Sequence, residues 1–158
     1  MSARGFVLAE DTHIVNILPP VDVTGGATGD VFSMANHSHA TIIVQVGVSA
    51  AAFTKIIVNE CTSLAAAGAT AIAYYAYAEE TAAGDTLAAR ESVAAAGRTP
   101  SANDNIFYVI ELDADDLSSG SHFVQLSLTN GSNSVIGSAV AILSGARYAE
   151  ASSATAIA

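Results

Sequence analysis

From residue 124 to residue 129 the chain alternates between apolar and polar side chains without a break. Val124, Leu126 and Leu128 fall on one side of an extended chain, whereas Gln125 and Ser127 fall on the other. A period of two is that of a β-strand with one buried and one wet face, because successive side chains of a strand point to opposite faces. This segment therefore predicts an antiparallel sheet that packs one face against a core.

β-branched and aromatic runs recur along the rest of the chain. They predict strands at residues 39–48, 54–61, 69–78, 105–113 and 134–143, with shorter candidates at 13–18 and 30–34. Within residues 69–78, Ile72 and Tyr74 share one face of the strand, and Tyr75 and Tyr77 share the other. Seven or eight short strands separated by turn signals are typical of an all-β fold, and we expect a single-domain β-sandwich of jelly-roll type.

Turn and helix signals divide these strands. Pro19 and Pro20 are expected to end the first strand, because neither can donate a backbone hydrogen bond. The dipeptide Asn130–Gly131 predicts an antiparallel hairpin between the last two strands, although residues 130–134 are long enough for a looser loop. Residues 113–117 predict one helical turn and residues 65–68 a hairpin connection. Residues 86–96 fit either a three-turn helix or a surface loop.

The chain has no repeat of fixed period and divides only at its ends. We expect residues 1–12 to be an N-terminal arm or the first strand, residues 13–147 to be the sandwich, and residues 148–158 to be a tail with little to bury. The first eleven residues lack the apolar stretch of a secretory signal. No window approaches the 20 or so apolar residues of a transmembrane helix.

Charge and cysteine content exclude several classes of protein. The 158 residues include 15 acidic and 5 basic side chains, for a formal net charge of −10. A nucleic-acid binder needs clustered Lys and Arg, and so does a protein that docks on anionic lipid, so neither partner is expected. Cys61 is the sole cysteine, which excludes an internal disulfide and a thiolate zinc cluster. In a strand, we interpret Cys61 as a small buried hydrophobe.

No constellation of residues indicates catalysis. The Gly-x-Ser-x-Gly motif is absent, and the paired carboxylates at 10–11, 79–80 and 115–116 are adjacent in the chain, as is typical of solvated turns. We therefore expect no enzyme, no catalytic residue and no cofactor. His37 and His39 are weak candidates for a metal site, which His13 and His122 could complete. Ordinary hydrogen bonds from these histidines are the favoured interpretation.

Four segments resemble a family. Residues 6–11 (FVLAED), 15–20 (VNILPP), 29–36 (GDVFSMAN) and 127–133 (SLTNGSN) are similar to small head proteins of tailed bacteriophages and prophages, and the resemblance covers residues 5 to 148. These are thought to be capsid decoration, or cement, proteins. The resemblance implies a structural virion protein, made in the bacterial cytoplasm, that binds the major capsid protein on the outer lattice and stabilises the head, often as a homotrimer.

A decoration protein needs contact surfaces rather than an active site. We expect Phe6, Val7 and Leu8 of the arm to contact the capsid or a neighbouring subunit, along with Tyr75 and Tyr77, because one face of each strand must point away from the core. The alternative is a tail-associated β domain: a tail-tube protein, a head–tail joining protein or a module that recognises host glycans. A hydrolase is a remote third possibility.

Overall fold

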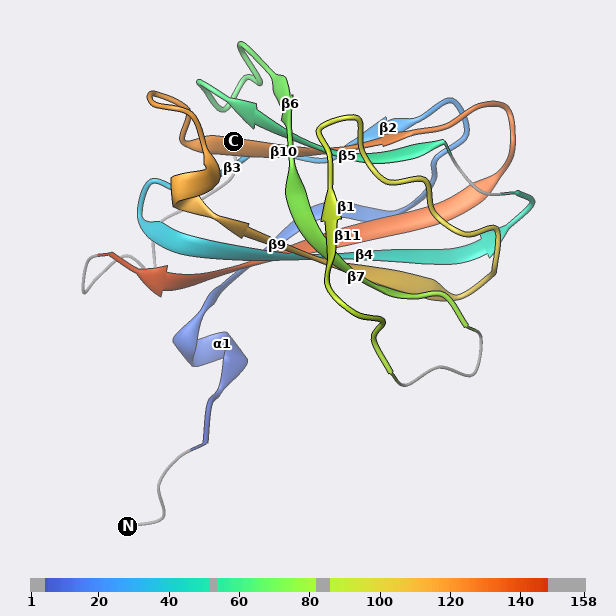
Figure 1. Cartoon of the computed structure of the whole chain (residues 1–158), viewed down its shortest axis with the longest axis horizontal. Helices are drawn as coiled ribbons and strands as arrows, with labels where there is room; N and C mark the ends of the chain where they lie inside the picture. The colour runs from blue at the N-terminus through green and yellow to red at the C-terminus, as the bar shows by residue number, and fades with distance from the viewer. Residues whose placement is uncertain (1–4, 52–53, 82–85, 148–158) are drawn as a thin grey trace.

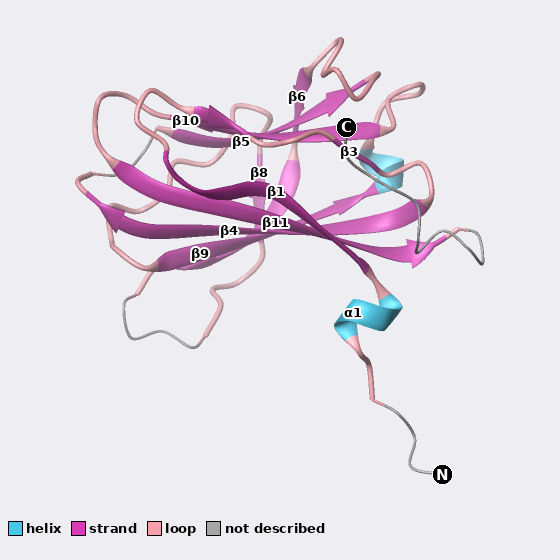
Figure 2. Cartoon of the chain, turned by 180° about the vertical axis from the view of Figure 1, so that it is seen from behind, coloured by secondary structure: helices cyan, strands magenta, loops and turns pink. Residues whose placement is uncertain are grey.

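Two antiparallel sheets pack face to face in the computed structural model, which describes residues 5–51, 54–81 and 86–147 (Figures 1 and 2). The six-stranded sheet runs in the order β1 (His13–Asp22), β11 (Val135–Ala146), β4 (His37–Ser49), β9 (Ile106–Asp113), β7 (Tyr74–Glu79) and β8 (Glu91–Val93). The second sheet runs β2 (Ala27–Thr28), β10 (Phe123–Thr129), β5 (Lys55–Cys61) and β6 (Thr70–Ile72), while β3 (Phe32–Ser33) also pairs with β10.

The strand pairs are nested in the manner of a jelly roll. The first strand, β1, pairs with the last, β11, and next inside them β2 and β3 pair with β10. Further inside, β4 pairs with β9, and β5 pairs with β6 at the centre of the nest. The expectation of an all-β sandwich is thus confirmed.

The core lies between the sheets and follows the predicted alternation. On β10, Val124, Leu126 and Leu128 are fully buried, and the residues between them are half-buried on the outside. One continuous cluster joins them to apolar residues of the other sheet, such as Ile42 and Tyr108. Cys61 is completely buried at the end of β5, and this burial raises the pKa of its thiol.

The prediction that Pro19 and Pro20 end the first strand is wrong. β1 continues through both prolines to Asp22. This is possible because β1 is the edge strand of its sheet, and its pairing with β11 shifts register between Asn16 and Leu18 and again between Leu18 and Val21. At such irregularities of an edge strand, a proline does not interrupt a ladder hydrogen bond.

The predicted hairpin at Asn130–Gly131 is also wrong. β10 and β11 belong to different sheets, so residues 130–134 cross from one sheet to the other. Local hydrogen bonds hold this crossing: Asn130 Nδ2 donates to the carbonyl of Val23 at 3.2 Å, and Ser134 Oγ donates to Asp22 Oδ2 at 2.7 Å. The Ser134 bond, with others from Thr24, lowers the pKa of Asp22 to about 2.

Residues 69–78, expected to be one strand, form two strands that lie in different sheets. The chain leaves the five-stranded sheet after β6 and enters the six-stranded sheet at Tyr74. The Tyr74 hydroxyl then donates to the carbonyl of Ile56 in the opposite sheet at 2.8 Å. Burial raises the pKa of this phenol to about 12.

The segments between the long strands are loops, short strands and single turns. Residues 86–96 contain no helix: they form a loop and the short edge strand β8, which is the surface-loop alternative. Residues 65–68 connect the antiparallel strands β5 and β6, as predicted.

The predicted helical turn near residue 113 is a 3₁₀ turn, η1 (Ala114–Asp116), in which the amide of Asp113 donates to Asp116 Oδ2 at 3.1 Å. Residues 5–12 form no strand, and they include the single-turn helix α1 (Leu8–Asp11).

Candidate docking surface

The side of the six-stranded sheet that points away from the core is apolar over several strands. Its central row crosses four strands in register, because Val140 of β11 lies opposite Ile43 of β4, Ile43 opposite Val109 of β9, and Val109 opposite Tyr77 of β7. We call this surface the outer face, and it consists of the residues Ile14, Ile43, Tyr75, Tyr77, Phe107, Val109, Val140 and Ile142. All of them are half-buried or exposed.

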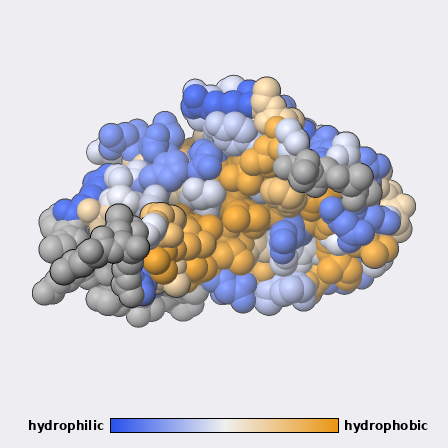
Figure 3. Space-filling view, turned by 90° about the horizontal axis from the view of Figure 1, so that it is seen from below, coloured by the Kyte–Doolittle hydropathy of each residue, from blue (hydrophilic) through white to orange (hydrophobic). Residues whose placement is uncertain are grey.

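Figure 3, which views the molecule from the side of this sheet, shows the apolar residues as an orange area broken by polar ones. An exposed group of apolar residues rimmed by polar ones is typical of a protein contact site. The central row was not predicted, although the sequence carried a signal for it: in Ile42–Ile43–Val44, apolar residues occupy both faces of one strand. An antiparallel sheet with a wet outer side would have a polar residue at position 43.

Tyr75 and Tyr77 lie on the outer face, side by side on β7, as their predicted orientation requires. Tyr75 is 39% exposed, and the guanidinium carbon of Arg90 lies 3.5 Å from the centre of its ring. This cation–π contact holds the ring at the β7 end of the outer face. Tyr74, the residue before Tyr75 on β7, points into the core, as expected from the alternation.

The three arm residues singled out in the sequence are all exposed. Phe6 is 73% exposed, and Val7 and Leu8 lie beside it at the start of α1. The Val7 amide donates to Asp11 Oδ2 at 2.7 Å, which closes the turn of α1 on itself. Figures 1 and 2 both show α1 beyond the six-stranded sheet, on the side of the outer face. The arm and the outer face are therefore exposed on the same side of the molecule, where one partner could contact both.

His39 occupies a polar end of the outer face and is paired with two carboxylates. Its Nδ1 lies 2.7 Å from Asp113 Oδ1, and its Nε2 lies 2.8 Å from Glu111 Oε2. Burial by itself would lower the pKa of His39, but the hydrogen bonds to Asp113 and Glu111 outweigh it and raise the pKa above its usual value. Both ring nitrogens are thus committed to carboxylates within the protein.

His37 is two residues away on the same strand and differs from His39 in burial, in hydrogen bonding and in the direction of its pKa shift. It is buried, its ring stacks on that of His13 with the centroids 6.2 Å apart, and its Nδ1 has no hydrogen-bond partner. Burial, followed by repulsion from His13, lowers its pKa. Of His13 and His122, the two histidines that the sequence suggested could join His37 and His39, His13 stacks on His37. Among the described residues, no group of three or more His, Cys, Asp or Glu is placed to hold a metal ion.

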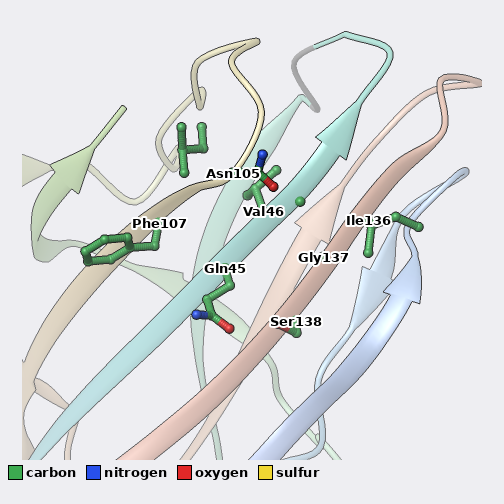
Figure 4. Close-up of a pocket in the computed structure, with 9 residues that line it drawn as sticks. Gln45, Val46, Asn105, Phe107, Ile136, Gly137 and Ser138 are labelled. Atoms are coloured by element: carbon green, nitrogen blue, oxygen red, sulfur yellow. The ribbon is translucent and has the colours of Figure 1, made fainter. Parts of the chain in front are cut away.

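A hollow of about 310 Å³ opens on the outer face, at the end where β4 finishes (Figure 4). We call it the hollow, and its lining residues come from three neighbouring strands, β4, β9 and β11, and from the residue before β9: Gln45, Val46, Gly47, Asn105, Ile106, Phe107, Ile136, Gly137 and Ser138. The absence of a side chain at Gly47 leaves this space open between Phe107 and Ile136. The hollow could not be predicted from the sequence, because it depends on the register of three strands.

No family model matches the chain, and no curated protein matches it. Among solved structures, it is similar to the crystal structure of the SPBc2 prophage-derived protein YomS, with a TM-score of 0.45 and 12% sequence identity. The match covers 84% of this chain and 93% of the other. At this TM-score the likeness says nothing of function. In the described part of the chain, no helix is long and apolar enough to cross a membrane.

Proposed function

We propose that this chain is a structural protein of a phage particle that decorates the outside of the head. In this proposal it binds the lattice of the major capsid protein, as a homotrimer, and stabilises the shell. The sequence resemblance to small phage head proteins suggested this role, and the observation that carries it is the outer face together with the apolar arm on the same side of the sandwich.

A decoration protein must be soluble before it binds and must bury apolar surface when it does. The net charge of −10 favours the first requirement, because copies of the free protein repel one another. The central row from Val140 to Tyr77 favours the second, because apolar residues at the middle of a contact surface contribute most of its binding free energy. Tyr75 and Tyr77 then lie where the sheet meets the capsid protein.

Co-sedimentation with capsids tests the proposal. Purified protein is mixed with expanded, undecorated capsids of the phage that encodes it, and the bound fraction is measured after pelleting. We expect saturable binding and capsids that withstand higher temperature. Failure of the protein to bind at micromolar concentration would overturn the proposal. A position on the tail in labelled micrographs would do so as well, in favour of the tail-associated alternative.

A matched pair of substitutions locates the contact. Tyr77→Ser removes an aromatic ring from the outer face, and Phe123→Ser removes one from the outside of the other sheet, where Phe123 is also half-buried. We expect Tyr77→Ser to weaken capsid binding at least tenfold and Phe123→Ser to leave it within twofold. Equal effects of the two substitutions would contradict the assignment of the outer face.

A further inference from the structure

We propose that the hollow on the outer face receives the ring of Phe6 from a second copy of this chain. This goes beyond capsid binding, since the contact would form in the free protein. Three observations support it: the exposure of Phe6, the size and position of the hollow, and the inability of the arm to reach its own hollow.

Phe6 is an aromatic side chain that is not buried against any of the described residues of its own subunit. Its exposed fraction of 73% is the largest among the large hydrophobic residues that the structure describes. An aromatic ring in a pocket is a common anchor of protein interfaces, because it buries a large apolar area at a small cost in side-chain entropy. Phe6 therefore has the chemistry of an anchor that lacks its pocket.

The hollow is large enough for this ring. The hollow has about 310 Å³ and is open to solvent, and an enclosed apolar cavity of about 150 Å³ already holds a benzene molecule. The lining of the hollow is mixed: Phe107 and Ile136, which is 41% exposed, are apolar, whereas Gln45, Asn105 and Ser138 are polar. The central row lies at the next outward-facing position of each strand, since Ile43 and Val109 are two residues from Gln45 and Phe107.

The arm of the same subunit cannot fill the hollow. His13 pairs with Leu143, and Leu143 pairs with Ala40, so His13 and Ala40 lie at the same height of the sheet. Gly47 is seven residues farther along β4, which is about 23 Å from Ala40 in the strand direction. Phe6 also lies seven residues from His13, but four of these form α1, so the arm spans roughly 16 Å. Figure 1 shows the arm directed away from the end where β4 finishes. The ring that enters the hollow must come from another molecule.

A second copy of the chain has the same exposed arm and can place its Phe6 in the hollow of the first copy. The contact joins two different surfaces, the arm of one subunit and the outer face of the next, and contacts of this type close into a ring when the rotation between copies permits. Three copies would give each subunit one filled hollow and one seated arm. The β7 end of each outer face, with Tyr75 and Tyr77, would remain available to the capsid protein.

Sedimentation and fluorescence together test the inference. The chain contains no tryptophan, so Phe6→Trp introduces a single probe at the predicted anchor. At concentrations where the protein sediments with three times the 15.9 kDa mass of one chain, we expect the emission to shift to the blue relative to the diluted monomer. An oligomer whose tryptophan emits as in water would overturn the inference, and so would a monomer at all concentrations.

Substitutions on both sides of the contact separate this result from misfolding. Phe6→Asp and Gly47→Val should each weaken self-association at least tenfold. Gly47→Val is tolerated by the strand, because a Cβ there has ordinary contacts of 3.5 Å or more with Ile136. Leu64→Asp, which alters an exposed residue of the β5–β6 turn, and Gly131→Val, in an open loop, are the controls and should leave self-association within twofold. Equal weakening by a control and its partner contradicts the inference.

Salt gives an independent readout. Each copy carries a net charge of −10, so an apolar contact between copies should strengthen when salt screens their repulsion. Self-association that weakens as salt is raised would indicate a contact held by ion pairs, and would count against Phe6 as its anchor. Because these measurements use the free protein, their failure is distinguishable from a failure to bind capsids.

Discussion

Ile43 on β4 lies directly opposite Val109 on β9, and both side chains point away from the core. Their neighbours in the chain, Ile42 and Ile110, are also opposite each other but completely buried. Two apolar pairs therefore stand back to back across one sheet. The inner pair belongs to the sandwich, and the outer pair is at the centre of the surface that we propose for docking.

This arrangement predicts unequal effects for the same substitution at adjacent positions. Ile42→Ala should lower the free energy of unfolding of the monomer by about 2–5 kcal/mol, because it leaves a cavity in the core. Ile43→Ala should lower it by about 1 kcal/mol, because its side chain is half-buried before the change. Urea denaturation at a concentration that keeps the protein monomeric measures both. Similar losses would mean that the outer face is covered within the monomer.

The His39 pairs predict a stability difference that depends on pH. The pKa of His39 is raised in the folded protein, so protonated His39 stabilises the fold below its unfolded pKa near 6.5, and this contribution is lost as pH rises through the higher folded value. His39→Gln should therefore cost about 1 kcal/mol or less below pH 6, and progressively less above pH 7. Thermal denaturation of both proteins between pH 5 and pH 9 measures the difference. A loss that grows with pH would contradict the pairing with Glu111 and Asp113.

The hydroxyl of Tyr74 joins the two sheets, and its removal should weaken the sandwich. Tyr74→Phe should lower the free energy of unfolding by ~1 kcal/mol, toward the lower end for a buried hydrogen bond, because the Ile56 carbonyl keeps a second donor in the amide of Arg98, at 3.0 Å. Tyr75→Phe makes the same change at an exposed position and is the control. Chemical denaturation of the two variants decides the matter, and a control as damaging as Tyr74→Phe would refute this role.

Burial predicts that the thiol of Cys61 is unreactive. Its side chain is fully buried, and burial, followed by the nearby charge of Glu60, raises its pKa, so little thiolate forms at neutral pH. A thiol reagent such as Ellman's should label the native protein at least a hundredfold more slowly than the protein in denaturing urea. Rapid labelling without denaturant would show that the end of β5 opens. An unreactive native thiol would also permit cysteine probes at Phe6.

The strand interiors were predictable because alternation is a local signal, as on β10, where every residue from Val124 to Thr129 points to its predicted side. The errors concern which sheet a strand joins. Asn130–Gly131 has the composition of a hairpin turn, yet pairing partners are set by long-range packing, which placed β10 beside β5 and β11 beside β4. Likewise, Pro19 and Pro20 are compatible either with the end of a strand or with an edge strand, and only the pairing of β1 with a single strand, β11, decides between the two.

The candidate site divides in the same way. The outward orientation of Tyr75 and Tyr77 followed from alternation alone. The partners of His39 did not, because Glu111 and Asp113 are 72 and 74 residues away and meet it only through the register of β4 with β9. The hollow required the same register together with that of β11. Features built by one strand were thus accessible from the sequence, and features built by several strands were not.

The prolines of β1 have a consequence for how copies of this chain can assemble. An open sheet edge invites another strand to join it, and repeated joining produces fibrils. Here one edge of the six-stranded sheet is interrupted by Pro19, Pro20 and two register shifts, and the other is β8, of three residues. The edges of the second sheet have two or three residues each. Growth by strand addition at the sheet edges is therefore disfavoured, so copies of this chain must associate through the apolar outer face rather than by extending their sheets.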